Sequence, residues 1–330
     1  MTINYYVCNH KLMKNRNNCM QPTVNKTPRI EVVDALRGFA VMAIILVHNL
    51  EHFIFPVYPE QSPEWLNILN QGVFHGVFAL FAGKAYAIFA LLFGFTFYIQ
   101  SNNQKKQGKD FGYRFLWRLI LLAGFATLNA AFFPAGDVLL LFVVVGIILF
   151  LTRNWSNKMI LFTATFFLIQ PIEWYHYIAN LLNPAHQLPN LGVGAMYGEV
   201  AEVTKAGNFW DFICCNVTLG QKASFLWAVN AGRFMQTAGL FLLGFYIGRK
   251  QLFVTTEKNL RFWTKALIIG AISFAPLYTL KEVIMQNDAI IKQTVGTAFD
   301  MWQKLAFTFV LVSSFVLLYQ REAFRKRVSG

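Results

Sequence analysis

Long apolar segments constrain this chain more than any other feature. Eight blocks of mostly hydrophobic residues approach or exceed the roughly 20 helical residues that cross a bilayer. Charged residues make up only 14% of the 330 residues, against roughly 25% in a soluble domain. The sequence therefore predicts an all-α polytopic integral membrane protein with about eight transmembrane helices. The predicted segments are 34–54, 72–99, 113–133, 137–152, 157–172, 223–248, 262–280 and 301–319.

Basic residues are distributed unevenly between the two ends of these segments. Cytoplasmic loops of membrane proteins are enriched in Lys and Arg. With the N-terminus in the cytoplasm, 22 of the 29 Lys and Arg residues fall on the cytoplasmic side and 4 on the outer side. We therefore expect both termini in the cytoplasm. The net charge of +13 then reflects orientation in a lipid bilayer, and no nucleic acid is expected as a partner.

The chain divides into three expected parts. Residues 1–28 are polar and predict a disordered tail, with Met20 as an alternative start, and residues 321–330 predict a basic cytoplasmic tail. Residues 29–320 predict a single transmembrane helical domain. Within it, the aromatic stretch 173–222 is too long for an ordinary connection. We expect this extracytoplasmic stretch to form an ordered layer at the membrane interface.

Ionisable side chains inside apolar segments are costly, so each is a candidate functional residue. Asp34 and Arg37 lie three residues apart and are neighbours on a helix. From Arg37 to His48 is eleven residues, which returns to within about 20° of the same face, about 16 Å along the axis. We expect Arg37, near the cytoplasmic face, to share one stripe with His48 deep in the membrane. Alternatively, Arg37 is only a snorkelling anchor.

His48 also begins an H-x-x-E-H pattern with Glu51 and His52. This spacing is the zinc signature of the inverted metalloproteases. The preceding helix is apolar up to Val47, no third ligand follows at a fixed spacing, and five residues match easily by chance. We therefore expect no metal, and we interpret Glu51 and His52 as residues of the outer interface.

Three further charges interrupt or open apolar segments. Lys84 follows residues 72–83, which can be interfacial or re-entrant, so Lys84 either faces a polar cavity or snorkels to the outer interface. Asp137 opens a segment at the positive end of a helix. Arg233 lies near the middle of 223–248, where we expect it to face a cavity or to pair with an acid such as Asp137.

Five stretches in order resemble the YeiB-like membrane family, which is defined by domain of unknown function 418. The resemblance covers about residues 29 to 319. The stretches are RIEVVDALRGFAVMAIILVHN (29–49), GKAYAIFALLFGFTF (83–97), RFLWRLILLAGFATLNAAFFPAGDVLLLFVVVG (114–146), LIQPIEWYHYI (168–178) and GRFMQTAGLFLLGFYIGRKQLF (232–253).

That family is similar to the wider transmembrane acyltransferase superfamily, which includes type-three acyltransferases and heparan glucosaminide acetyltransferases. Its members move an acyl group from cytoplasmic acyl-CoA to a carbohydrate outside. Type-three members share an Arg, ten residues and then a His in the first helix, as at Arg37 and His48. The chain departs from its relatives in two respects. Relatives usually have a His near the "GD" motif, and in this chain Leu140 and Phe142 occupy that neighbourhood. Relatives also usually continue with further helices after the part that this sequence matches.

The resemblance implies a membrane-bound acyltransferase of the bacterial inner membrane. Its expected co-substrate is acetyl-CoA or another acyl-CoA, and its acceptor is an envelope glycan or a small molecule. Arg37, oriented by Asp34, would bind CoA phosphates, and His48 would act as general base or acyl carrier. The alternatives are a transporter or flippase for a small solute or lipid-linked group, and a non-catalytic membrane protein. The remaining candidates for the substrate cavity are Asn49, Lys84, Asp137, Arg233, Trp174 and Tyr175.

Overall fold

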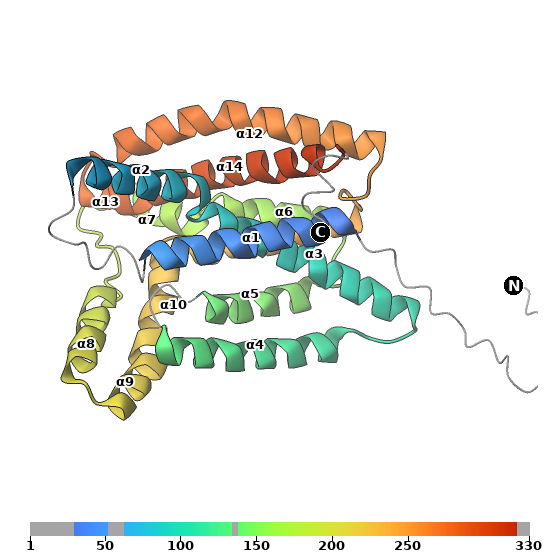
Figure 1. Ribbon diagram of the computed structural model, residues 1–330. Coiled ribbons are helices and arrows are strands. Elements are labelled where there is room, and N and C mark those ends of the chain that lie inside the picture. Colours follow the sequence, from blue (N-terminus) through green and yellow to red (C-terminus); the bar gives the residue numbers. More distant parts are fainter. Residues whose placement is uncertain (1–29, 52–62, 134–137, 322–330) are drawn as a thin grey trace, which may run out of the picture.

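The computed structural model describes residues 30–51, 63–133 and 138–321, and this described part consists of helices and connections without strands. The long helices lie side by side and run between the same two ends of the molecule (Figure 1). In chain order the helices are α1 (Glu31–Asn49), α2 (Glu64–Phe81), α3 (Lys84–Lys106), α4 (Gly112–Phe132), α5 (Leu139–Thr152), α6 (Asn157–Leu168), α7 (Pro171–Leu182), α8 (Val193–Ala206), α9 (Phe209–Cys215), η2 (Asn216–Gly220), α10 (Gln221–Asn230), α11 (Arg233–Arg249), α12 (Glu257–Ile284), α13 (Ala289–Ile291), η3 (Lys292–Gly296) and α14 (Thr297–Leu318).

Four helical stretches of the described residues are long and apolar enough to cross a membrane: Glu64–Lys106, Gly112–Phe132, Glu257–Ile284 and Ala289–Leu318. Helices α5 and α6 are apolar but shorter. The chain is therefore an all-helical integral membrane protein. The count of about eight crossings and the cytoplasmic position of both termini stay predictions.

Two glycines divide two of the predicted apolar segments. Gly83 has φ 75° and separates α2 from α3, and Gly232 has φ 69° and separates α10 from α11. Glycine adopts these left-handed angles without the strain that a side chain causes. The prediction of a single helix over 223–248 was therefore wrong, whereas a break between 72–83 and the residues from Lys84 onward, which the sequence left open, is present. Arg233 is the first residue of α11, not a residue in the middle of a helix.

Helices α3 and α11 pack against each other at the centre of the molecule. A Cβ on Gly94 would lie 1.9 Å from the carbonyl oxygen of Phe241, and a Cβ on Gly244 would lie 1.9 Å from that of Leu91. Only glycine permits this approach of two backbones. The beginnings of α3 and α11 lie at the same end of the molecule, where Ala85, Tyr86 and Arg233 line one cavity.

The neighbours of α3 and α11 follow one pattern. Helix α1 packs on α3 as α6 packs on α11, and α14 packs on α3 as α5 packs on α11. Helix α4 packs on α5 as α12 packs on α14. Helix α3 with α1, α14 and α12 therefore forms one group of helices, and α11 with α6, α5 and α4 forms an equivalent group. Because α3 and α11 pack against each other, any site at their beginnings lies between the two groups.

The end of the molecule at which α3 and α11 begin also carries α8, α9 and α10, on the left of Figure 1. The predicted layer 173–222 lies in this region and contains most of α7 together with α8, α9 and η2. The predicted tail 1–28 and residues 322–330 of the predicted basic tail lie outside the described residues.

Candidate functional site

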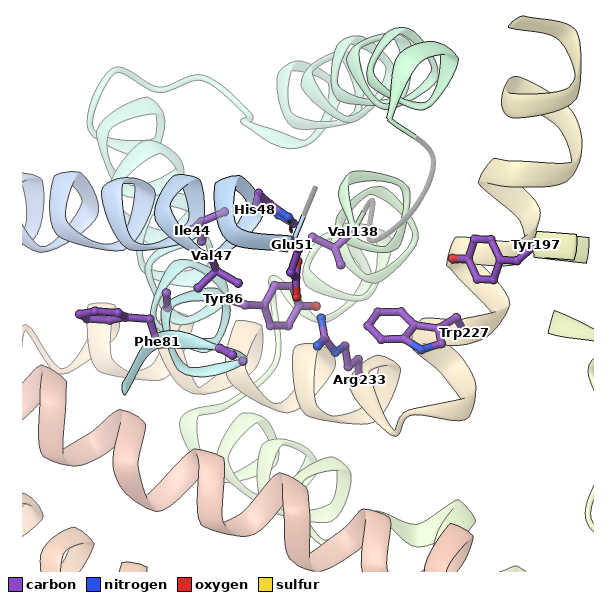
Figure 2. Close-up of a pocket in the computed structure, with 13 residues that line it drawn as sticks. Ile44, Val47, His48, Glu51, Phe81, Tyr86, Val138, Tyr197, Trp227 and Arg233 are labelled. Atoms are coloured by element: carbon purple, nitrogen blue, oxygen red, sulfur yellow. Dashed lines mark ion pairs between the residues drawn. The ribbon is translucent and has the colours of Figure 1, made fainter. Parts of the chain in front are cut away.

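A cavity of about 320 Å³ lies where α1 ends and α3 and α11 begin (Figure 2). We call it the His48 cavity. Its walls combine one histidine, one carboxylate and one arginine with four large aromatic side chains. The lining residues are Ile44, Val47, His48, Glu51, Phe81, Ala82, Gly83, Ala85, Tyr86, Val138, Tyr197, Trp227 and Arg233.

His48 and Glu51 form a pair at the end of α1. Helix α1 begins at Glu31 and ends at Asn49, so His48 lies in its last turn, and residues 52–54 of the predicted segment lie outside the described residues. His48 Nδ1 lies 3.3 Å from Glu51 Oε2. A carboxylate beside one imidazole nitrogen can orient the ring. The other nitrogen, Nε2, can then exchange a proton with a ligand.

From the sequence, Glu51 was expected at the outer interface, and its contact with His48 was not predicted. The available signal was their separation of three residues, which brings side chains together on a helix. In the view of Figure 2, the Glu51 side chain points from the end of α1 toward Tyr86 and Arg233. Glu51 therefore belongs to the cavity wall.

Arg233 lies between two aromatic rings. Its Cζ atom is 4.5 Å from the ring centroid of Trp227 and 5.4 Å from that of Tyr86. Within the part of the chain that the structure describes, its guanidinium forms no hydrogen bond and no ion pair. Cation–π contacts use the faces of the rings and leave the N–H groups of the guanidinium available.

Tyr86 is held in place from the neighbouring helix. Its hydroxyl is hydrogen-bonded to the hydroxyl of Thr237. Thr237 donates its single proton to the carbonyl oxygen of Arg233 at 2.6 Å, so Tyr86 is the donor of the bond to Thr237. This chain of bonds ties the beginning of α3 to the beginning of α11.

Lys84 begins α3 but does not line the His48 cavity. The side chain is buried, and its Nζ atom donates a hydrogen bond to the carbonyl oxygen of Ala79 at 2.8 Å. Nζ also lies 5.7 Å from the ring centroid of Phe307. Lys84 therefore points toward α14, away from the His48 cavity.

Three other predicted cavity residues, Asn49, Trp174 and Tyr175, are not among the lining residues of the His48 cavity. Asn49 donates a hydrogen bond to the carbonyl oxygen of Ile45 at 3.2 Å. Trp174 stacks on Trp302 with ring centroids 6.0 Å apart. Tyr175, the next residue of α7, is exposed. A fourth predicted residue, Asp137, lies outside the described residues, and its pairing with Arg233 stays a prediction.

A second pocket, of about 200 Å³, contains Arg37, and we call it the Arg37 pocket. Arg37 donates hydrogen bonds from Nη1 to Asp34 Oδ1 at 2.9 Å and from Nη2 to Thr96 Oγ1 at 3.0 Å. The contact between Asp34 and Arg37 that their spacing predicted is therefore present. The lining residues are Arg37, Phe89, Leu92, Phe93, Thr96, Phe97, Gln100, Phe115, Arg118, Leu119 and Leu122.

A wider groove of about 630 Å³ shares Gln100 and Arg118 with the Arg37 pocket. The groove adds Arg114, which donates a hydrogen bond to Gln104 at 3.2 Å. From the sequence, Arg114 and Arg118 were counted among the cytoplasmic basic residues and were not named as members of a site. Their spacing of four residues, which aligns side chains on one helix face, was the signal that they act together. The other lining residues are Asn103, Gln104, Phe111, Tyr113 and Trp117.

The zinc interpretation finds no support in the described part of the chain. There, no group of three or more His, Cys, Asp or Glu side chains is arranged to hold a metal ion. His52 lies outside the described residues.

Two family models match the chain. Residues 29–190 match the catalytic region of heparan-alpha-glucosaminide N-acetyltransferase, and residues 247–330 match a protein family of unknown function, DUF418. Together, the two matches support a YeiB-like DUF418 membrane family. The first match includes His48, Glu51 and Arg37, so residues 29–190 are acetyltransferase-like.

A curated relative is the uncharacterized protein YxaH of Bacillus subtilis (strain 168), which is 32% identical over 155 residues. The alignment covers 44% of this chain and 37% of the relative, so the chain matches little more than a third of the relative's length. No solved structure matches this chain.

Proposed function

We propose that this protein is a membrane-bound acyltransferase in which the Arg37 pocket takes the acyl-CoA and the His48 cavity takes the acceptor. One observation carries the proposal. Helix α1 has Arg37 in a cationic pocket toward one end and the His48–Glu51 pair in an aromatic cavity at the other. The similarity of residues 29–190 to an acetyltransferase catalytic region supports the same chemistry.

The donor end suits coenzyme A. Arg37, Arg114 and Arg118 line adjoining pockets, and arginine binds phosphate groups through paired hydrogen bonds. Trp117 and Tyr113 line the same groove and offer flat faces to the adenine base. Arg114 and Arg118 belong to the basic segment 100–118, which we expect to face the cytoplasm because cytoplasmic loops are enriched in Lys and Arg. Acyl-CoA is found on that side of the membrane.

The acceptor end suits proton transfer. His48 takes the proton from an acceptor hydroxyl or amine through Nε2 while that group attacks the thioester carbonyl carbon. The carbon–sulfur bond breaks, and His48 returns the proton to the departing CoA thiolate. Glu51 stabilises the imidazolium between the two transfers. In the covalent alternative, His48 itself carries the acyl group, and acyl-imidazole would accumulate when acceptor is withheld.

Calorimetry with acetyl-CoA tests the donor site. The purified full chain in lipid nanodiscs should bind acetyl-CoA, and Arg37→Ala or Arg118→Ala should weaken binding by roughly tenfold or more, the effect of one charge-assisted hydrogen bond. The matched control is Arg261→Ala, because Arg261 is exposed and pairs only locally, with Glu257 at 3.3 Å. Absence of binding to the unaltered protein would exclude acyl transfer from CoA.

A second function is favoured by the same two pockets. Cavities toward opposite ends of one helix bundle also suit a transporter for a small solute or lipid-linked group. Transport would continue in His48→Ala and would not depend on CoA. Acyl transfer predicts the reverse: His48→Ala binds acetyl-CoA normally and transfers nothing.

A further inference from the structure

Among the described residues, none forms a hydrogen bond or an ion pair with the guanidinium of Arg233. Its guanidinium carries five N–H donors, yet its recorded side-chain contacts are the rings of Trp227 and Tyr86. Burying a charge away from water without hydrogen bonds is costly. Because Arg233 lines a cavity, the N–H groups are accessible to a ligand there.

Two acidic side chains of the described residues act on Arg233, and both are engaged elsewhere. Glu51 and Asp300 attract Arg233 through space. Asp300, however, is paired with Lys304 and accepts a hydrogen bond from Gln303 at 3.1 Å. Glu51 contacts His48 at 3.3 Å. Neither carboxylate forms a contact with the guanidinium, so an additional anion has a place beside Arg233.

The aromatic walls of the cavity are fixed before a ligand arrives. Tyr86 is bonded to Thr237, and the Tyr197 hydroxyl lies 2.9 Å from the hydroxyl of Ser224. Trp227 packs on Arg233 itself. A volume of about 320 Å³ lies at the lower end of the range for small-molecule sites, about 300–1,000 Å³. Flat aromatic walls and this size suit one sugar ring.

We propose that Arg233 binds a negatively charged substituent of the acceptor, so that the acceptor is an acidic carbohydrate carrying a carboxylate or a phosphate. This inference rests on the proposed function, because it concerns the acceptor side of that reaction. His48 and Arg233 line the same cavity. One sugar ring can therefore present its anionic group to Arg233 and a hydroxyl or amine to His48.

Binding without CoA tests the inference separately from catalysis. The full chain in phosphatidylcholine nanodiscs is titrated with methyl glucuronide, glucose 6-phosphate and neutral methyl glucoside. We expect at least one acidic sugar to bind about tenfold or more tightly than methyl glucoside, as one charge-assisted hydrogen bond provides. Arg233→Gln should abolish this preference, and Arg233→Lys should retain part of it.

The matched control is Lys84→Gln. Lys84 is the cation at the equivalent position of α3, but its side chain points away from the His48 cavity. The preference should survive in this variant. Gel filtration and thermal melting establish that each variant is folded, and Lys84→Met is the second control where Lys84→Gln fails to fold.

Equal binding of acidic and neutral sugars, or no binding of any of the three, overturns the inference. So does an acidic preference that survives in Arg233→Gln. A stabilisation by phosphatidylglycerol that Arg233→Gln removes, without sugar binding, assigns the anion to a lipid headgroup and also overturns it. If the unaltered protein shows the Arg233-dependent preference but does not bind acetyl-CoA, acyl transfer fails while the acidic-sugar site stands.

Discussion

Phe142 lies edge-on to Tyr86, with ring centroids 5.4 Å apart and planes inclined by 77°. Tyr86 lines the His48 cavity. Phe142 also contacts Phe89 and Phe93, at 5.7 Å and 5.6 Å, and both of these line the Arg37 pocket. The two sites share no lining residue, and the buried ring of Phe142 contacts the walls of both. We therefore expect the Phe142 ring to act as a barrier between the two sites.

Removing the Phe142 ring should open the passage between donor and acceptor sites. In Phe142→Ala we expect faster hydrolysis of acetyl-CoA when no acceptor is present, because water reaches the thioester. We also expect a loss of about 3–5 kcal/mol in stability, as for other buried Phe→Ala changes. Thiol release and thermal melting measure the two effects.

The control for Phe142→Ala is Phe162→Ala, since Phe162 is exposed on α6. It should change neither hydrolysis nor melting. Unchanged hydrolysis in a folded Phe142→Ala protein would mean that Phe142 does not separate the two sites.

Glu51 should contribute to catalysis through His48. We expect Glu51→Gln to slow acyl transfer, because the amide does not stabilise a protonated imidazole, whereas the KM for acetyl-CoA stays unchanged. His48→Ala should remove the general-base contribution, about 10²–10⁴-fold. Kinetics with acetyl-CoA and an acidic sugar measure both. A double variant that is no slower than His48→Ala would show that the two residues act as one unit, and fully additive losses would contradict this.

The sequence predicted the parts of the site that depend on local spacing. The contact between Asp34 and Arg37 follows from helix geometry alone, and it is present. The division of two segments at Gly83 and Gly232 depends on the positive φ angles of these glycines. Residues of neighbouring helices also restrict the space around both glycines, as Lys304 does at Gly83. No local pattern reports such neighbours, so the sequence placed Arg233 inside a helix.

The grouping of Arg233 with His48 and Trp227 also depends on tertiary packing. These residues lie far apart in the chain, and the close approach of α3 and α11 brings the start of α11 to the end of α1. The sequence identified Arg233 as costly inside a membrane, but not which residues surround it. The sequence gives the kinds of side chain, and helix packing decides which of them meet.

The close approach of α3 and α11 should depend on two glycines. In Gly94→Ala and Gly244→Ala the new methyl group would meet a backbone carbonyl oxygen, of Phe241 or Leu91, at 1.9 Å. Overpacking usually costs about 1–3 kcal/mol, and backbone atoms yield less than side chains do. We expect a strongly lowered melting temperature or failure to fold.

Gly124 provides the matched control for these variants. It lies in helix α4, and a Cβ there would meet nothing within 4 Å. Gly124→Ala should be neutral or stabilising by about 0.5–1 kcal/mol, since alanine favours helix more than glycine does. Equal melting of Gly94→Ala and Gly124→Ala would contradict the tight packing of α3 on α11.

The pair His176 and His186 should make stability depend on pH. His176 Nδ1 lies 3.1 Å from His186 Nε2. Burial lowers the pKa of His176, and the neighbouring His186 lowers it further. The unfolded chain, with a His pKa of about 6.5, then binds more protons than the folded chain, so stability falls as the pH drops below about 6.5. Burial raises the pKa of Glu173, so Glu173 increases stability as the pH falls. Glu173 is present both in the unaltered protein and in a His176→Gln variant, so its effect is the same in the two proteins. We therefore expect the melting temperature to fall less between pH 7 and about pH 5 in His176→Gln than in the unaltered protein, and parallel curves would show that the pair does not titrate with folding.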